Sequence, residues 1–188
     1  MNSERFEAFI DAIVAIIITV IVLEIPVPDA VTWSSIWALR GEFFAYFVSF
    51  LLCYNYWNNH QKFFSFIESV NHQVIWLGAA SMFVLSFMPY LTSMIIRDPN
   101  SYFVLFLYGS IFIIIDIFFL GTCHVVKKLH PGDIELEKRV SIIFKKIMII
   151  IAIIVVGMIV GIAYPPAILY SCFGCLIASW LMVYLGIY

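Results

Sequence analysis

Six long apolar segments constrain what this chain can fold into more than any other feature of its sequence. Each is close to the about 20 residues that an α-helix needs to cross the hydrocarbon core of a bilayer. They cover residues 6–25, 36–57, 74–96, 102–126, 142–163 and 166–188. Backbone polar groups inside lipid must be paired within their own segment, so all six are expected to be helices. The sequence therefore predicts an all-α integral membrane protein with six transmembrane helices in a single domain, residues 1–188.

Composition excludes a soluble fold. Of the 188 residues, 64% are hydrophobic and only 12% are charged, whereas soluble domains carry about 25% charged residues. A domain of this size leaves much of its surface in water, so it has no way to hide this much apolar area. The net charge is −2, and no basic stripe is interleaved with aromatics, so a nucleic-acid partner is not expected. The expected partner is the lipid bilayer.

Prolines lie mostly at the joints between the apolar segments, as helix breakers should. Pro89 is the exception, because it lies inside the third segment. A proline within a membrane helix is tolerated when neighbouring helices satisfy the freed carbonyl group. The third segment is therefore expected to remain one helix.

The basic residues predict the orientation. If the N-terminus lies inside, eight of the ten Lys and Arg residues lie on the inner side, and only Arg40 and Arg97 lie outside. This asymmetry obeys the positive-inside rule. We therefore expect a multi-pass protein of the inner (cell) membrane with both termini in the cytoplasm. Glu4, Glu7 and Asp11 interrupt any basic leader region, so the first segment is expected to stay in the protein as a helix.

The first segment carries an apolar stripe. At about 100° per residue, Ile16, Thr19, Val20 and Leu23 share one face of a helix. Asp11 points about 140° away from Ile16 and lies off that face. A threonine in such a helix usually hydrogen-bonds its own backbone. Spacing alone therefore favours ordinary helix packing and leaves a pore-lining face open.

Two acidic residues in the apolar segments, Asp11 and Asp116, need an explanation, because charge inside a membrane is costly. Asp11 lies near a helix end together with Arg5, which can extend to the membrane surface. The two form either an inconsequential interfacial pair or a polar clamp that holds the first helix against its neighbours. Asp116 lies nearer the middle of the fourth segment. An ion pathway, a proton relay and an interhelical hydrogen bond all remain open for Asp116, and the hydrogen bond is favoured.

Neither cysteine nor histidine spacing indicates a metal site. The residues concerned are Cys53, Cys123, Cys172, Cys175, His60, His72, His124 and His130. The pair Cys172-Phe-Gly-Cys175 has no second pair of ligands, so a structural role is expected. No His-Glu-x-x-His or similar pattern occurs. We expect no metal, no cofactor and no enzymatic activity.

One motif in the first segment carries a family resemblance. Arg5-x-x-x-Phe9-Ile10-Asp11 resembles the Arg-x-x-x-Phe-Ser-Asp signature of the transmembrane protein 175 family, the endosomal and lysosomal potassium channels and their prokaryotic relatives. The following run Ala-Ile-Ile-Ile-Thr-Val-Ile-Val-Leu-Glu-Ile is also similar to that family's first helix. Ile10 stands where the signature has serine, and it has no hydroxyl to form the hydrogen bond of that serine.

Further motifs extend the resemblance over about the first half of the chain. They are Tyr46-x-x-Ser49-Phe50, Trp57-x-x-His60, Asn71 and Met88-Pro89-Tyr90-x-Thr92. The first two are similar to the family's second helix, and the others are similar to its third. The last three segments match only in number and hydrophobicity.

The resemblance implies a homotetramer in which the first helix of each subunit lines a central pore for K⁺. It places the pore-lining positions at Ile16, Thr19 and Leu23, with Val20 beside them. It also implies a network of motif residues at the cytoplasmic end of the first three helices, comprising Arg5, Asp11, Trp57, His60 and Asn71.

The sequence lacks the Thr-Val-Gly-Tyr-Gly filter of common potassium channels, and it lacks an arginine-rich voltage-sensing helix. A pore with apolar constrictions remains. Rings of Ile16 and Leu23 would close the path by excluding water, and a ring of Thr19 hydroxyls would partly replace the water around a cation. The stripe has no fixed charge, so modest selectivity for K⁺ over Na⁺ is expected.

Three other functions remain open from the residues alone. A proton-coupled transporter would use Asp11 and Asp116, although transporters usually show an inverted repeat or a pair of broken helices, and we detect neither. A membrane enzyme would use the four histidines. A purely structural membrane subunit would need no special residues.

Overall fold

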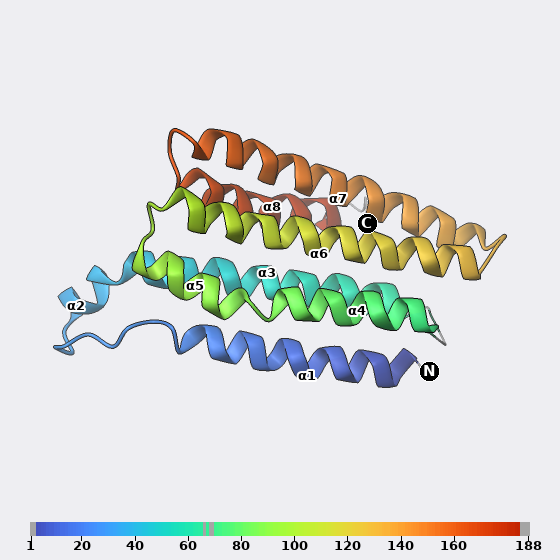
Figure 1. Cartoon of the computed structure of the whole chain (residues 1–188), viewed down its shortest axis with the longest axis horizontal. Helices are drawn as coiled ribbons and strands as arrows, with labels where there is room; N and C mark the ends of the chain where they lie inside the picture. Colours follow the sequence, from blue (N-terminus) through green and yellow to red (C-terminus); the bar gives the residue numbers. More distant parts are fainter. Residues whose placement is uncertain (1–2, 66, 68–69, 185–188) are drawn as a thin grey trace.

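The computed structural model describes residues 3–65, 67 and 70–184, and its helices run side by side in one elongated bundle (Figure 1). The described residues form helices and connections, with no β-strand among them. The helices are α1 (Ser3–Val22), α2 (Trp33–Ala38), α3 (Arg40–Phe64), α4 (His72–Leu85), α5 (Met88–Arg97), α6 (Tyr102–Leu129), α7 (Ile134–Gly161) and α8 (Ala167–Tyr184).

Two of the predicted segments are divided between helices. Segment 36–57 begins in the short α2 and continues in α3, which runs on to Phe64. Segment 74–96 is divided into α4 and α5 at residues 86–87, just before Pro89. Proline lacks an N–H group and its ring clashes with the carbonyl group four residues earlier, which explains the break. Residues 185–188 of the predicted last segment lie outside the described residues.

Three stretches of the described chain are long and apolar enough to cross a membrane: His72–Arg97, Tyr102–Leu129 and Ile134–Gly161. A shorter apolar stretch covers Ala167–Met182. The charged residues of α1 lie in its first half, and the polar ones of α3 lie mostly in its second half. These charged and polar residues explain why α1 and α3 are not among the three stretches. The composition and number of the apolar helices are those of a multi-pass membrane protein.

Side chains cap several helix starts. Asn71, Ser101 and Asp133 each accept a hydrogen bond from the backbone N–H three residues later, at the start of α4, α6 and α7. Such caps satisfy backbone donors that have no partner within the helix. The cap at Asp133 starts α7 eight residues before the predicted segment, because hydrophobicity alone did not detect the charged first two turns.

α1 lies at one edge of the bundle and packs on α3, α4 and α5, whereas α7 lies at the opposite edge and packs on α6 and α8 (Figure 1). α3 contacts α1, α5 and α8, so it joins the two sides. A Cβ at Gly157 of α7 would collide with the side chain of Ser171 of α8. A Cβ at Gly161, one turn later, would likewise lie too close to the side chain of Ile168 of α8. Small residues four apart let membrane helices approach closely in this way.

The two ends of the bundle differ in charge. The N-terminus, the α3–α4 connection and the α6–α7 connection share one end (Figure 1). Lys62, Lys127 and Lys128 belong to the last turns of α3 and α6 at that end. Arg40 begins α3 and Arg97 ends α5 at the other end. The structure thus gathers most of the basic residues at one end, whereas Lys146, counted among the inner residues, lies buried well inside α7. The cytoplasmic assignment of that end stays a prediction.

Candidate functional site

α1 has one buried face and one exposed face. The buried face consists of Phe6, Ile10, Val14, Ile17 and Ile21, which pack into the core of the bundle. Ile16 is 63% exposed and Leu23, in the turn directly after α1, is 77% exposed. Thr19 and Val20 are exposed between them. The four residues expected to line a pore therefore lie together on a face that the described part of the chain leaves uncovered.

Thr19 supplies the hydroxyl of this face. Its Oγ1 donates a hydrogen bond to the Ile16 carbonyl oxygen at 2.8 Å. The hydroxyl hydrogen is thereby directed to the backbone, and the lone pairs of the oxygen stay available as acceptors. An exposed hydroxyl in this state can face a cation with its oxygen.

Asp11 lies away from the exposed face and contacts α3. Its Oδ1 accepts a hydrogen bond from Trp57 Nε1 at 2.8 Å, and both of its carboxylate oxygens lie 3.2 Å from Gln61 Nε2. Trp57 and Gln61 are four residues apart and therefore neighbours on one face of α3. Together they clamp the first half of α1 to the second half of α3.

The other residues of the first motif have different surroundings. Ile10 is buried in the core, so an apolar side chain fills the position of the signature serine. Phe9 and Arg5 are exposed. Within the described residues Arg5 has no hydrogen bond or ion pair, so the clamp consists of Asp11 and two residues of α3 and not of an Arg5–Asp11 pair.

The implied motif network is only partly assembled in the chain. Asp11 and Trp57 are in direct contact. His60 instead packs within an aromatic cluster, stacked on Phe64 with a centroid distance of 4.6 Å and close to Phe6. Asn71 caps α4 by accepting from the Val74 N–H at 2.9 Å. His60 thus packs against α1 through Phe6, and Asn71 fixes the start of α4, on which α1 packs.

Sequence reasoning missed two contacts. Gln61 completes the Asp11 clamp, and its position one turn after Trp57 was the available signal. Tyr108 of α6 joins Ser49 of α3, whose Oγ lies 2.9 Å from both the Tyr108 hydroxyl and the Thr92 hydroxyl. Ser49 and Thr92 belong to the motifs of the second and third segments, so the structure brings these motifs together. No pattern around Tyr108 indicates its partner.

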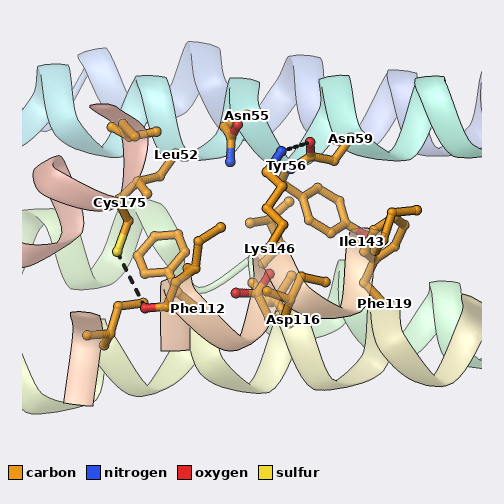
Figure 2. A pocket seen from close by; sticks show the side chains of 16 residues that line it. Leu52, Asn55, Tyr56, Asn59, Phe112, Asp116, Phe119, Ile143, Lys146 and Cys175 are labelled. Carbon is orange, nitrogen blue, oxygen red and sulfur yellow. Dashed lines mark hydrogen bonds between the residues drawn. The ribbon is translucent and has the colours of Figure 1, made fainter. Parts of the chain in front are cut away.

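Asp116 lies on the far side of α3 from Asp11. It lines a cavity between α3, α6, α7 and α8, where Lys146 is its charged neighbour (Figure 2). It accepts no direct hydrogen bond from another described residue, so the interhelical bond favoured from the sequence is not observed there.

The cysteines and histidines do not assemble into a metal site in the described part of the chain, where no three His, Cys, Asp or Glu residues are grouped for one. Cys53, Cys123, Cys172 and Cys175 are all buried as free thiols.

Known proteins resemble this chain in sequence. Residues 5–89 match the family described as endosomal/lysosomal potassium channel TMEM175. A potassium channel of Chryseobacterium sp. (strain P1-3) is 32% identical over 165 residues, which are 88% of this chain and 85% of that protein. A potassium channel of Streptomyces collinus is 35% identical over 98 residues, 50% of this chain and 48% of the other.

The fold also resembles a solved structure. The crystal structure of a lysosomal potassium-selective channel TMEM175 homolog from Chamaesiphon minutus superposes with a TM-score of 0.73. It covers 95% of this chain and 96% of that one at 23% identity. The sequence match to the Chryseobacterium channel confirms the family resemblance seen in the first three segments. The likeness in fold extends through the last three, where the sequence offered only hydrophobicity.

Proposed function

Because this chain belongs to the TMEM175 family, we propose that it is a potassium channel subunit in which the exposed face of α1 lines the pore. The observation that carries this proposal is the position of Ile16, Thr19, Val20 and Leu23. The first three share the face of α1 that the described chain leaves uncovered, opposite a buried face, and Leu23 continues this exposed stripe in the turn after the helix. The relatives named above are potassium channels, and K⁺ is accordingly the proposed permeant ion.

The proposed assembly is a homotetramer of six-helix subunits, each formed by residues 1–188 as one channel domain. α4 and α5 would act together as one spanning unit, and α1 and α3 would span with their polar halves at the inner end. The exposed stripe of α1 supports this arrangement, because four copies around an axis would bury the stripe that a single copy leaves open. The bilayer is the other proposed partner, with both termini on the cytoplasmic side of the inner membrane.

The proposed closed state is a pore that excludes water. Ile16 and Leu23 are branched apolar residues on one face, nearly two turns apart, and a ring of four at either level would narrow the path enough to dewet it. Opening would tilt or rotate the α1 helices and widen the rings. The Thr19 oxygens, between the two levels, would replace part of the hydration shell of a passing cation. A site without fixed charge predicts modest preference for K⁺ over Na⁺.

Arg5, Phe9, Asp11, Trp57, His60 and Asn71 would serve assembly and gating. The contacts of Asp11 with Trp57 and Gln61 support this role, because they orient α1 on α3 without touching the stripe. The same contacts argue against a proton-coupled transporter that uses Asp11 and Asp116. Asp11 is engaged by one face of α3, whereas Asp116 lies beside Asn55 and Asn59 on the opposite face.

Ion flux from purified protein tests the proposed function. Protein reconstituted into liposomes should release K⁺ down its gradient, with slower flux of Na⁺. Liposomes with the same amount of protein carrying Leu23→Trp should show reduced K⁺ flux, because a bulkier ring at that level blocks the path. Absence of K⁺ flux from folded, inserted protein, or equal flux from the variant, would contradict the proposed pore.

A further inference from the structure

Asp116 and Lys146 place opposite charges at the same depth of the bundle. Asp116 lies 13 residues before the end of α6, and Lys146 lies 12 residues after the start of α7. The two helices are neighbours joined by a short connection. At about 1.5 Å per residue, both side chains lie roughly 18–20 Å from that connection. A charge at such depth in a membrane helix needs compensation.

A cavity lies between these two charges. Its volume is about 40 Å³, and residues of α3, α6, α7 and α8 line it together with Leu85 at the end of α4 (Figure 2). The polar lining consists of Asn55, Tyr56, Asn59, Asp116 and Lys146, with a cysteine thiol at one side. A water molecule needs roughly 10–15 Å³ on this measure, so the cavity has room for about three.

Direct contacts satisfy only part of this polar lining. Lys146 is 5% exposed, and its Nζ donates to Asn59 Oδ1 at 2.9 Å. Ser179 Oγ donates to Asn55 Oδ1 at 3.0 Å, while the Asn55 amide nitrogen points into the cavity (Figure 2). The Asp116 carboxylate accepts no direct hydrogen bond from a described residue. The cavity thus has an anionic acceptor on one wall and N–H donors on the others.

We propose that this cavity is a hydration site, in which ordered water bridges the Asp116 carboxylate to the Lys146 ammonium and the Asn55 amide. Water is the small molecule that fits both walls, because it donates to a carboxylate and accepts from N–H groups. The bridge gives the Asp116 carboxylate a donor and links it to the Lys146 ammonium, which also donates to Asn59. The site is separate from the proposed pore, since none of its lining residues belongs to α1.

Other occupants fit the lining less well. A monovalent cation would share the cavity with the Lys146 ammonium, and only one carboxylate is present to neutralise the two positive charges. An apolar molecule would leave Asp116 and the Asn55 amide without partners, which is costly in a low-dielectric interior.

Hydroxyl-radical footprinting of the purified protein tests for water directly, because radicals formed from bound water modify the side chains beside it. Tyr56 lines the cavity. Tyr108 is also buried but lies outside the cavity lining and pairs with Ser49, so it is the matched control. We expect brief exposures to modify Tyr56 and Phe112 much faster than Tyr108. Background modification of all three residues would show a dry cavity and overturn the proposal.

A filling substitution links that labelling to the cavity. Asn55→Leu removes the amide and occupies part of the space, so labelling of Tyr56 should fall to the level of Tyr108. Asn58→Leu makes the same chemical change on α3 outside the cavity lining and should leave the labelling of Tyr56 unchanged. Labelling of Tyr56 that persists in folded Asn55→Leu protein would place its water elsewhere and contradict the proposed site.

Two further measurements distinguish the occupant and the coupling. Diffraction data from crystals grown in RbCl should show no anomalous peak in the cavity, and a peak there would make it a cation site instead.

Asp116→Asn and Lys146→Met should each lower the melting temperature. The decrease in the double variant should be smaller than the sum of the two single decreases, because each single variant leaves one buried charge without the opposite charge across the cavity. Losses that simply add would show that the charges are not bridged, contrary to the proposal.

Discussion

The Ile16 side chain projects from the uncovered face of α1, where the proposed pore has its inner constriction. Ile16→Asn adds a polar amide to each ring without adding charge. Because a hydrophobic gate works by excluding water, the amides should rehydrate it. We expect higher basal K⁺ conductance and weaker discrimination against Na⁺, measured as single-channel current and reversal potential in planar bilayers.

Two variants of the same type control for this change. Ile117 of α6 is 55% exposed, much like Ile16, but lies outside α1. Ile117→Asn should leave basal conductance unchanged. Ile17, one residue on from Ile16, is buried against the bundle, so Ile17→Asn should reduce the yield of folded protein by burying an unpaired amide, at about 1–3 kcal/mol. Indistinguishable currents from Ile16→Asn and Ile117→Asn would make the stripe a packing face.

Thr19 tests the oxygen ring separately from the apolar rings. Thr19→Val keeps nearly the same shape but removes the oxygen whose hydrogen is donated to the Ile16 carbonyl. Because that hydrogen bond lies within one helix and is exposed, its loss should not disturb assembly. We expect lower K⁺ conductance or a smaller K⁺ over Na⁺ permeability ratio, with the same elution volume on size exclusion. Unaltered permeation would remove the hydroxyl from the proposed mechanism.

Asp11 is the residue-scale link between α1 and α3. Asp11→Asn replaces one carboxylate oxygen by an NH₂ group. That group then faces the N–H donor of Trp57 or of Gln61, and the hydrogen bond to that donor is lost. Hydrogen bonds to charged groups contribute about 1.5–3 kcal/mol, and we expect a loss of that order. The oligomer should melt at lower temperature, or the channel should open differently, at an unchanged permeability ratio. A change in the ratio alone would place Asp11 in the pore.

Glu7 offers the matched control for Asp11. It lies one turn earlier on α1, and among the described residues its carboxylate accepts a hydrogen bond only from the nearby Ser3 Oγ. Glu7→Gln therefore changes the same charge on the same helix without touching α3. Thermal stability of the oligomer should remain close to that of the unaltered protein.

At the scale of elements, α1 packs closely on α4 where the Phe6 ring of α1 lies against Gly78 of α4. A Cβ at this position would collide with the ring of Phe6, which is itself packed against Phe64. Gly78→Ala should displace α1 and destabilise the subunit by about 1–3 kcal/mol, the usual cost of overpacking. Gly174→Ala in α8 meets nothing within 4 Å, so it should be neutral or stabilising through helix propensity. Thermal melting of the two variants compares these effects.

Hydrophobicity predicted the helical elements well, because a lipid solvent demands long apolar helices. Hydrophobicity did not predict helix boundaries that depend on sterics or on capping hydrogen bonds. The break before Pro89 follows from a missing donor and a steric clash, and the early start of α7 follows from the Asp133 cap. The close packing at Gly157 and Gly161 was readable as a pair of small residues four apart, although its partner helix was not.

For the candidate site, the sequence predicted which residues share a face of one helix, but not which residues of different helices are in contact. Helical spacing placed Ile16, Thr19 and Leu23 on one face and Asp11 off it, as the structure has them. Contacts between helices were not readable in the same way. Neither the Tyr108–Ser49 contact nor the cavity beside Asp116 leaves a periodic signal, because both depend on how distant segments are brought together.

At the scale of the whole molecule, the bundle is lopsided. α7 and α8 pack closely on each other and α3 joins the two sides, whereas the apolar stripe of α1 has no partner within the described chain. A cyclic arrangement of identical subunits covers such a stripe by placing it against its own copies. The polar contacts of Asp11 and the packing of Phe6 would then fix the angle at which each α1 faces the axis.

Cross-linking at Leu23 tests that arrangement. Leu23→Cys places a thiol on the exposed stripe, and fourfold symmetry would bring four of them together near the axis. The native cysteines are all buried, so oxidation with copper phenanthroline should link subunits through residue 23 and give disulfide dimers on non-reducing gels. Trp180→Cys, on the exposed surface of α8, is the matched control and should link poorly. Efficient linking at residue 180 together with none at residue 23 would place α8 at the axis, and the proposed pore would then be wrong.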